Sequence, residues 1–276
     1  MNMLDALILG IVQGLTEFIP ISSSAHLVIV PRLLQIDKPP LVFDVLLHFG
    51  TLLALILIYW KDILKLGSAF CGITTDILLK REFKGIHNDT YKRLVFLIIL
   101  TTIPTGLAGI FFNDYVEILF NNVLSVGFFL LGTGFVLAIG QRKLGGKKEI
   151  LNITIIDALL IGLAQGLAIA PGISRSGITI VACLSRGLNR ELAANYTFLV
   201  AIPVILAATI LEAKDLGKEL ISLHLIIIGV LVAFISGYLA IKVLLKIVKR
   251  GKLNIFVWYC WIVGLIIIGA YLQGLV

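Results

Sequence analysis

Apolar residues dominate the chain in runs that are long enough to cross a lipid bilayer. A helical span needs about 20 consecutive, mostly apolar residues. Six such runs are present, at approximately residues 41–60, 93–112, 118–140, 192–211, 221–241 and 254–275. The pattern predicts an all-α, polytopic membrane protein that forms a single integral membrane domain over residues 1–276.

Two further apolar stretches, 3–35 and 153–187, are interrupted near their middle by Pro, Gly and Ser. Each has a helix-length run, a polar break and a second, shorter run. In hydrocarbon such a break leaves backbone groups unpaired unless protein or a water-filled cavity surrounds it. We therefore expect two re-entrant helical hairpins whose polar turns are buried in the protein.

Composition and charge agree with a membrane location and indicate an orientation. Only 14% of the residues are charged, against about 25% in soluble proteins. Of the 23 Lys and Arg residues, 18 fall in segments 61–93, 141–152, 186–191 and 242–253. The positive-inside rule places these segments in the cytoplasm and both termini outside. The net charge of +7 then reflects topology, so nucleic-acid binding is not expected, and the absence of Lys or Arg before Arg32 argues against a cleaved signal peptide.

The two interrupted stretches match each other at an offset of 152 residues. GIVQGLTEFIPISSSA at 10–25 aligns without gaps with GLAQGLAIAPGISRSG at 162–177. Because the charge distribution gives the hairpins opposite orientations, the match predicts an inverted-topology repeat with halves at approximately 1–145 and 146–276. In such repeats the polar turns meet near the bilayer midplane.

The two turns differ in their polar residues, and together they would form one asymmetric site. The first contains Glu17, serines at 22–24 and His26, whereas the second contains Arg175. A buried arginine normally has a partner and a function. Its planar fork suits phosphate oxygens, and serines at a helix start add donors. The alternative is a structural ion pair with Glu17.

The three consecutive serines have two interpretations. A serine after a proline commonly caps the helix that follows. Ser22 and Ser23, however, lie four and three residues before His26, so helical winding could bring a hydroxyl close to the imidazole. A hydroxyl beside an activating base is the arrangement for covalent phosphoryl or acyl transfer. The spacing leaves capping and catalysis both open.

Other polar residues could complete the same cavity. Gln13 lies one helical turn before Glu17. A carboxylate near phosphate oxygens is unfavourable unless it is protonated, paired with Arg or bridged by a divalent cation such as Mg²⁺ or Ca²⁺. Asp44 and His48, one turn apart in the first span, could line the cavity or an interface. The candidate binding residues are Gln13, Ser22, Ser24, His48, Ser174 and Ser176, and the candidate cation ligands are Glu17 and Gln13.

GLTEFIPISSSAH at 14–26 and PGISRSG at 171–177, with FDVLLHFGTLLALILIYW at 43–60 between them, closely resemble the undecaprenyl pyrophosphate phosphatases of the bacitracin-resistance type. The resemblance covers essentially the whole chain. It implies an integral membrane enzyme with interlocked inverted repeats. Such an enzyme removes the terminal phosphate from the C55 polyprenyl diphosphate at the outer face of the cell membrane, with a divalent cation. It also implies a role in peptidoglycan synthesis and bacitracin resistance.

Carried over by position, the resemblance assigns the essential glutamate to Glu17 and the nucleophile to Ser23. It assigns the motif histidine to His26 and the phosphate-binding arginine to Arg175. The family commonly has a second glutamate where this chain has Gln13. Because Gln13 adds no charge, the two-carboxylate account of cation binding does not carry over directly.

The resulting hypothesis is phosphoryl transfer from a polyprenyl diphosphate lipid. Ser23 attacks the terminal phosphorus, and His26 or Glu17 takes its proton. Arg175, hydroxyls and a cation neutralise the phosphates. The alternative is a secondary transporter or lipid-phosphate flippase, because inverted repeats with broken helices are also typical of transporters. A nucleophile beside a base favours the enzyme, and a homodimer stays open.

Overall fold

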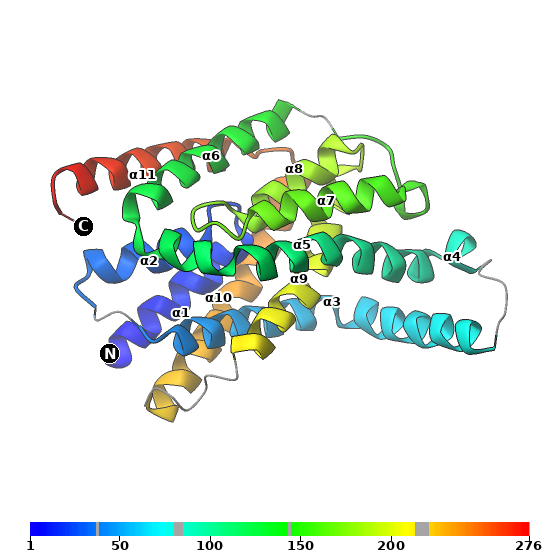
Figure 1. Cartoon of the computed structure of the whole chain (residues 1–276), viewed down its shortest axis with the longest axis horizontal. Helices are drawn as coiled ribbons and strands as arrows, with labels where there is room; N and C mark the ends of the chain where they lie inside the picture. Colours follow the sequence, from blue (N-terminus) through cyan, green and yellow to red (C-terminus); the bar gives the residue numbers. More distant parts are fainter. Residues whose placement is uncertain (37–38, 80–84, 143–144, 213–220, 276) are drawn as a thin grey trace.

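The regular structure is helical. The computed structural model describes residues 1–36, 39–79, 85–142, 145–212 and 221–275, so the parts of the predicted connections at 80–84, 143–144 and 213–220 lie outside the described residues. The helices are α1 Met3–Phe18, α2 Ser23–Leu33, α3 Leu41–Leu78, α4 Gly85–Asn88, α5 Thr90–Asn121, α6 Val123–Arg142, η1 Ile150–Asn152, α7 Ile155–Leu167, α8 Arg175–Ser185, α9 Arg190–Glu212, α10 Leu223–Lys249 and α11 Asn254–Leu272. Figure 1 shows their arrangement.

Six helices within the described ranges are long and apolar enough to cross a membrane, which confirms the predicted number of spans. They are α3, α5, α6, α9, α10 and α11. The span predicted at 118–140 begins too early, because residues 118–121 belong to α5 and α6 starts at Val123. The span predicted at 41–60 was too short, because α3 has 38 residues and is about 57 Å long at 1.5 Å per residue. Its predicted end coincides with a kink at Tyr59 (φ −101°, ψ 16°). Charged residues beyond the kink end the apolar run but do not stop a helix.

Each interrupted stretch folds as two helices joined by a turn, α1 with α2 and α7 with α8. The first helix of each pair begins with the same capping box, in Asn2 and Asp5 for α1 and in Thr154 and Asp157 for α7. These positions keep the offset of 152. Re-entry into a bilayer and the division into repeat halves remain predictions.

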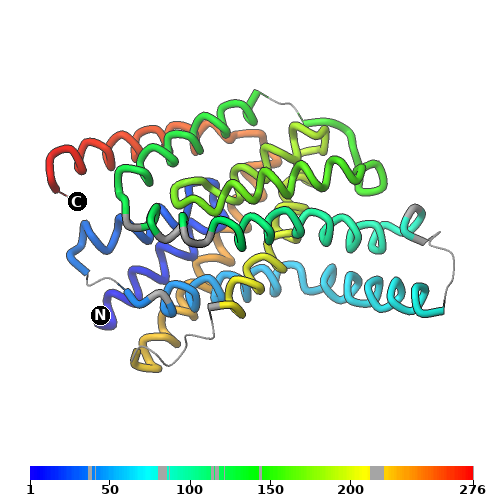
Figure 2. Tube along the Cα trace, viewed as in Figure 1, coloured from blue at the N-terminus to red at the C-terminus, as the bar shows by residue number. Residues whose placement is uncertain are grey.

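The first helix of each pair packs against a span from the other half of the chain. α1 lies against α10, and α7 lies against α5 (Figures 1 and 2). Glycines allow this close approach: a Cβ on Gly14 would lie 2.6 Å from the carbonyl oxygen of Ala233, and one on Gly162 would lie 2.2 Å from that of Thr101. Because each of these first helices packs against a helix from the other half of the chain, the two turns lie near each other in the middle of the molecule.

The end of the α7–α8 pair that lies away from its turn is held together by a buried charge. Asp157 is fully buried at the start of α7. Its carboxylate accepts hydrogen bonds from Lys148 Nζ at 2.7 Å and from Arg186 Nε at 2.6 Å. Arg186 caps the C-terminus of α8, so both helices of the hairpin are anchored at one point.

The two termini lie at the same end of the molecule, and α4 lies at the opposite end (Figure 1). This arrangement agrees with the prediction that both termini face one side of the membrane. Which side faces the cytoplasm remains a prediction from the charge distribution.

Candidate active site

The turns of the two helix pairs contact each other, as the sequence predicted. The backbone N–H of Gly172 in the second turn donates to Ser22 Oγ at 3.2 Å and to Ser24 Oγ at 3.4 Å in the first. Gly172 has φ +105°, and a Cβ there would lie 2.6 Å from the carbonyl oxygen of Val126. Thr133 Oγ1 donates to the Gly172 carbonyl at 2.8 Å. The second turn thus requires glycine at this position.

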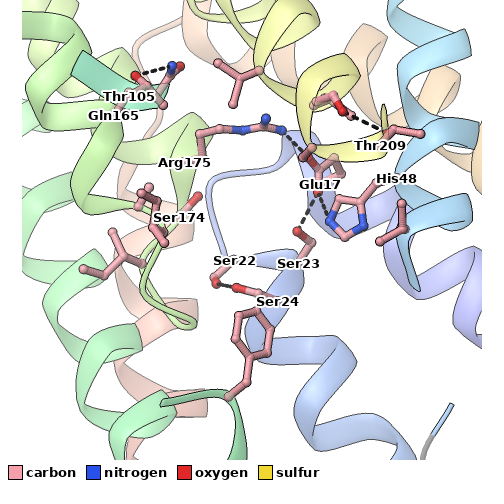
Figure 3. A pocket seen from close by; sticks show the side chains of 18 residues that line it. Glu17, Ser22, Ser23, Ser24, His48, Thr105, Gln165, Ser174, Arg175 and Thr209 are labelled. Carbon is pink, nitrogen blue, oxygen red and sulfur yellow. Dashed lines mark hydrogen bonds and ion pairs between the residues drawn. The ribbon is translucent and has the colours of Figure 1, made fainter. Parts of the chain in front are cut away.

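A cavity of about 300 Å³ lies beside the joined turns (Figure 3). Its polar lining comes mostly from the turns and from α3, and includes Glu17, Ser22–Ser24, His48, Ser174 and Arg175. The rest of the lining is mainly apolar and includes Val45, Val204, Ile205 and Ala208 from α3 and α9. The cavity therefore offers both charged and polar groups and apolar surface to a bound molecule.

The Glu17 carboxylate is the centre of the polar lining. Its side chain, in the last turn of α1, is 3% exposed. Oε1 accepts a hydrogen bond from the Arg175 guanidinium, and Oε2 accepts from Ser23 Oγ at 2.6 Å and from Gln13 Nε2 at 3.0 Å. Figure 3 shows Ser23 and Arg175 on either side of this carboxylate. The ion pair considered as an alternative role for Arg175 does form, and it lies in the cavity wall.

His48 belongs to this site. Its Nε2 lies 3.5 Å from Glu17 Oε2. Its Nδ1 lies 2.8 Å from the backbone carbonyl oxygen of Asp44, and since a carbonyl only accepts, Nδ1 carries a proton. Nε2 therefore faces the carboxylate, and the contact is attractive when the imidazole is protonated. Asp44 contributes its backbone to this orientation.

Ser22 caps α2 in a strained conformation. Its φ of 68° and ψ of 97° are unusual for a residue other than glycine, and such conformations cost about 1–3 kcal/mol. Its Oγ accepts from the backbone N–H of Ala25 at 3.4 Å, so the capping interpretation holds for this serine. Ser24 Oγ lies 3.1 Å from Ser22 Oγ. Ser23, the first residue of α2, instead directs its hydroxyl to Glu17.

His26 lies outside the cavity lining, which corrects the expectation that a serine hydroxyl would contact its ring. Its Nδ1 is 2.7 Å from the backbone carbonyl oxygen of Ser22, and its Nε2 is 2.7 Å from the hydroxyl of Tyr259. In a helix the main-chain carbonyl of residue i lies near residue i+4, which explains the contact with the Ser22 carbonyl. The Ser22 hydroxyl instead accepts a hydrogen bond from the Gly172 N–H. The carboxylate of Glu17, rather than the ring of His26, therefore accepts the hydrogen bond from Ser23.

The start of α8 presents Arg175 to the cavity. Ser174 is its N-cap, with Oγ accepting from the Gly177 N–H at 3.2 Å. The positive end of the helix dipole favours an anion here. Ser176 Oγ lies 3.2 Å from Ser174 Oγ. Ser176 is buried and is not among the residues that line the cavity, so its predicted contact with the substrate stays a prediction.

Three polar residues of the lining were missed by the sequence analysis: Thr105, Gln165 and Thr209. Gln165 Nε2 donates to Thr105 Oγ1 at 3.0 Å. Gln165 could have been found, because it is the repeat counterpart of Gln13. Thr105 and Thr209 gave only the weak signal of a hydroxyl within an apolar run.

The residues present do not form a ready-made divalent-cation site. Within the described ranges, no three His, Cys, Asp or Glu side chains are grouped so that they could hold a metal ion. Both oxygens of the Glu17 carboxylate already accept hydrogen bonds, and Gln13 turns its amide N–H toward it rather than its carbonyl. A second carboxylate would be needed to favour a cation at this point.

Replacing Gln13 with Glu should create a site that favours a divalent cation next to Glu17. The substitution removes a donor 3.0 Å from Glu17 Oε2 and brings two carboxylates together. We expect Gln13→Glu to retain activity at saturating Mg²⁺ and to need about tenfold less Mg²⁺ for half-maximal phosphate release. The control is Gln165→Glu, whose amide contacts a threonine instead of a carboxylate. Loss of turnover at saturating Mg²⁺ would show that the neutral amide has a specific role.

The chain matches a known protein family and curated relatives over nearly its whole length. Residues 6–266 match the family described as "Bacitracin resistance protein BacA". The chain is 45% identical over 269 residues to the undecaprenyl-diphosphatase of Methanobrevibacter smithii, covering 97% of each chain. It is 45% identical over 271 residues to that of Halothermothrix orenii, covering 97% of this chain and 98% of the relative. Since the match includes both turns and the helices that line the cavity, the chain belongs to the bacitracin resistance protein BacA family.

Proposed function

We propose that the protein hydrolyses undecaprenyl diphosphate to undecaprenyl monophosphate and phosphate. The observation that supports this most strongly is the hydrogen bond of 2.6 Å from Ser23 Oγ to Glu17 Oε2, with the Arg175 guanidinium on the other carboxylate oxygen. A nucleophile, its base and a phosphate-binding group thus share one buried cavity. Transport alone requires no nucleophile next to a base, so the arrangement favours an enzyme over a flippase.

The cavity suits a diphosphate that carries a hydrocarbon tail. The diphosphate would lie against Arg175, the Ser174 hydroxyl and the start of α8, where the guanidinium and the helix dipole offset its charge. The first isoprene units would lie along Val204, Ile205 and Ala208 of α9. The substrate would reach this position laterally from the bilayer.

In the first step, Ser23 Oγ forms a bond to the terminal phosphorus. The bond between that phosphorus and the bridging oxygen breaks, and the Ser23 proton moves to Glu17 Oε2. When the phosphates engage Arg175, the carboxylate loses part of its ion pair and becomes a stronger base. The leaving prenyl monophosphate has a second pKa of about 6, so it departs without a dedicated general acid.

In the second step, water attacks the phosphoseryl phosphorus and the bond from phosphorus to Ser23 Oγ breaks. Protonated Glu17 returns its proton to that oxygen, which restores the starting serine and carboxylate. Both protons of the water leave on the released phosphate, which then loses one to solvent. Arg175 and, when protonated, His48 stabilise the charge on the equatorial oxygens in both steps.

The wider setting follows the sequence predictions. We place the protein in the cell membrane, with the cavity accessible from the outer face, where recycling of the lipid carrier would support cell-wall synthesis and lower sensitivity to bacitracin. A required Mg²⁺ or Ca²⁺ would bind chiefly through the diphosphate oxygens, because the protein offers a single engaged carboxylate.

The direct test is phosphate release from C55 polyprenyl diphosphate by the purified protein, with Mg²⁺ and with EDTA. We expect release with Mg²⁺ that depends on protein concentration and is absent from a Ser23→Ala preparation, which controls for contaminating phosphatases. Movement of labelled lipid between the leaflets of vesicles, without phosphate release, would instead support the transporter.

A further inference from the structure

The strained conformation of Ser22 is held by a chain of contacts that begins on the last helix. The Ser22 carbonyl is 2.7 Å from His26 Nδ1. Because a carbonyl oxygen can only accept, Nδ1 must carry the hydrogen. In the neutral ring Nε2 then accepts, and its partner is the Tyr259 hydroxyl at 2.7 Å. The two rings also stack, with centroids 5.8 Å apart and planes at 20°.

This chain ends one peptide bond before the proposed nucleophile. Ser22 has φ 68°, and the next residue, Ser23, places its hydroxyl 2.6 Å from Glu17 Oε2. If the Ser22 peptide relaxed to an ordinary conformation, the Ser23 hydroxyl would turn away from the carboxylate. The Ser22 peptide is therefore linked directly, through the backbone, to the residue whose hydroxyl contacts Glu17.

We propose that Tyr259 is a positioning residue that acts through His26 to hold the Ser22 peptide and so aim Ser23 at Glu17. The inference rests on the proposed function. It gives His26 a positioning role as well, since both of its ring nitrogens are engaged away from the cavity. The C-terminal helix α11, which lines none of the cavity, thereby controls the reacting group.

The test is a double-mutant cycle on phosphate release. Tyr259→Phe should lower kcat about tenfold with little change in KM, because the substrate contacts stay in place while the nucleophile is misaligned. His26→Ala should lower kcat further. Adding Tyr259→Phe to His26→Ala should have no extra effect, because Tyr259 acts only through His26. Tyr271→Phe, a change to another tyrosine of α11 that is absent from the cavity lining, is the control and should keep wild-type kcat.

A conservative variant separates positioning from proton transfer. Asn can donate from a position similar to that of Nδ1 but cannot serve as a base, so His26→Asn should retain several-fold more turnover than His26→Ala. A thermal-unfolding curve is first recorded for each variant, and only variants that are folded at the assay temperature are compared. Wild-type kcat in Tyr259→Phe, additive effects in the double variant, or equal losses in the Asn and Ala variants would overturn the inference. Absence of phosphate release by the wild type would overturn the proposed function itself.

Discussion

Replacing Ser23 with Ala should lower turnover by about a thousandfold or more while the protein stays folded and still binds the diphosphate. The change removes the hydroxyl that donates to Glu17 Oε2 at 2.6 Å but leaves Arg175 and the helix start available to the phosphates. Ser24→Ala is the matched control. Its hydroxyl contacts Ser22 and Gly172 and not the carboxylate, so its loss should be less than tenfold.

Covalent capture distinguishes nucleophilic attack from simple binding by Ser23. Rapid acid quench with terminally ³²P-labelled substrate should leave label on the wild type and none on Ser23→Ala. If water attacked directly and Ser23 only bound phosphate, no quench would yield labelled protein. In that case Ser23→Ala would weaken substrate binding together with turnover.

Replacing Arg175 with Lys should lower kcat/KM by about a hundredfold although the positive charge is kept. A lysine is a point charge and cannot make the planar, two-pronged contact with phosphate oxygens. It would also leave the buried Glu17 carboxylate, 3% exposed, with a poorer partner. The measurement is phosphate release over a range of substrate concentrations.

The same helix supplies a matched control for Arg175. Arg186, at the other end of α8, also pairs with a buried carboxylate, that of Asp157, but it lies outside the cavity lining. Arg186→Lys should keep nearly normal kcat/KM and lose some thermal stability. Near-normal turnover in Arg175→Lys would reduce Arg175 to a charge in the cavity wall.

Much of the fold could be predicted, because hydrocarbon imposes strict rules on sequence. The six apolar runs and the two interrupted stretches appear in the structure as six span-length helices and two helix pairs. The length of α3 could not be predicted from hydropathy. The apolar run ends at Trp60, but polar residues can continue a helix as readily as apolar ones. The kink at Tyr59 lies where the apolar run ends.

The sequence could predict which residues of the candidate site lie close together where the repeat aligned them. It could not predict contacts that depend on the direction in which a side chain points. The offset of 152 indicated that Arg175 would meet the turn that contains Glu17 and Ser23. Helical spacing placed His26 near the serines, but it could not show that the ring would meet a backbone carbonyl and Tyr259. His48 was an open candidate for the same reason, since spacing does not fix which way a ring turns.

The ion pair of Glu17 and Arg175 has a consequence for how the protein is made. The two residues are 158 positions apart, and ribosomes add about 5–20 residues per second. Glu17 is therefore synthesised roughly 8–30 s before its guanidinium partner exists. An unpaired carboxylate is unfavourable in hydrocarbon, and the helix against which α1 packs is synthesised later still. The pair of helices α1 and α2 can therefore reach its final packing only near the end of synthesis, which makes the proposed catalytic centre one of the last parts of the molecule to form.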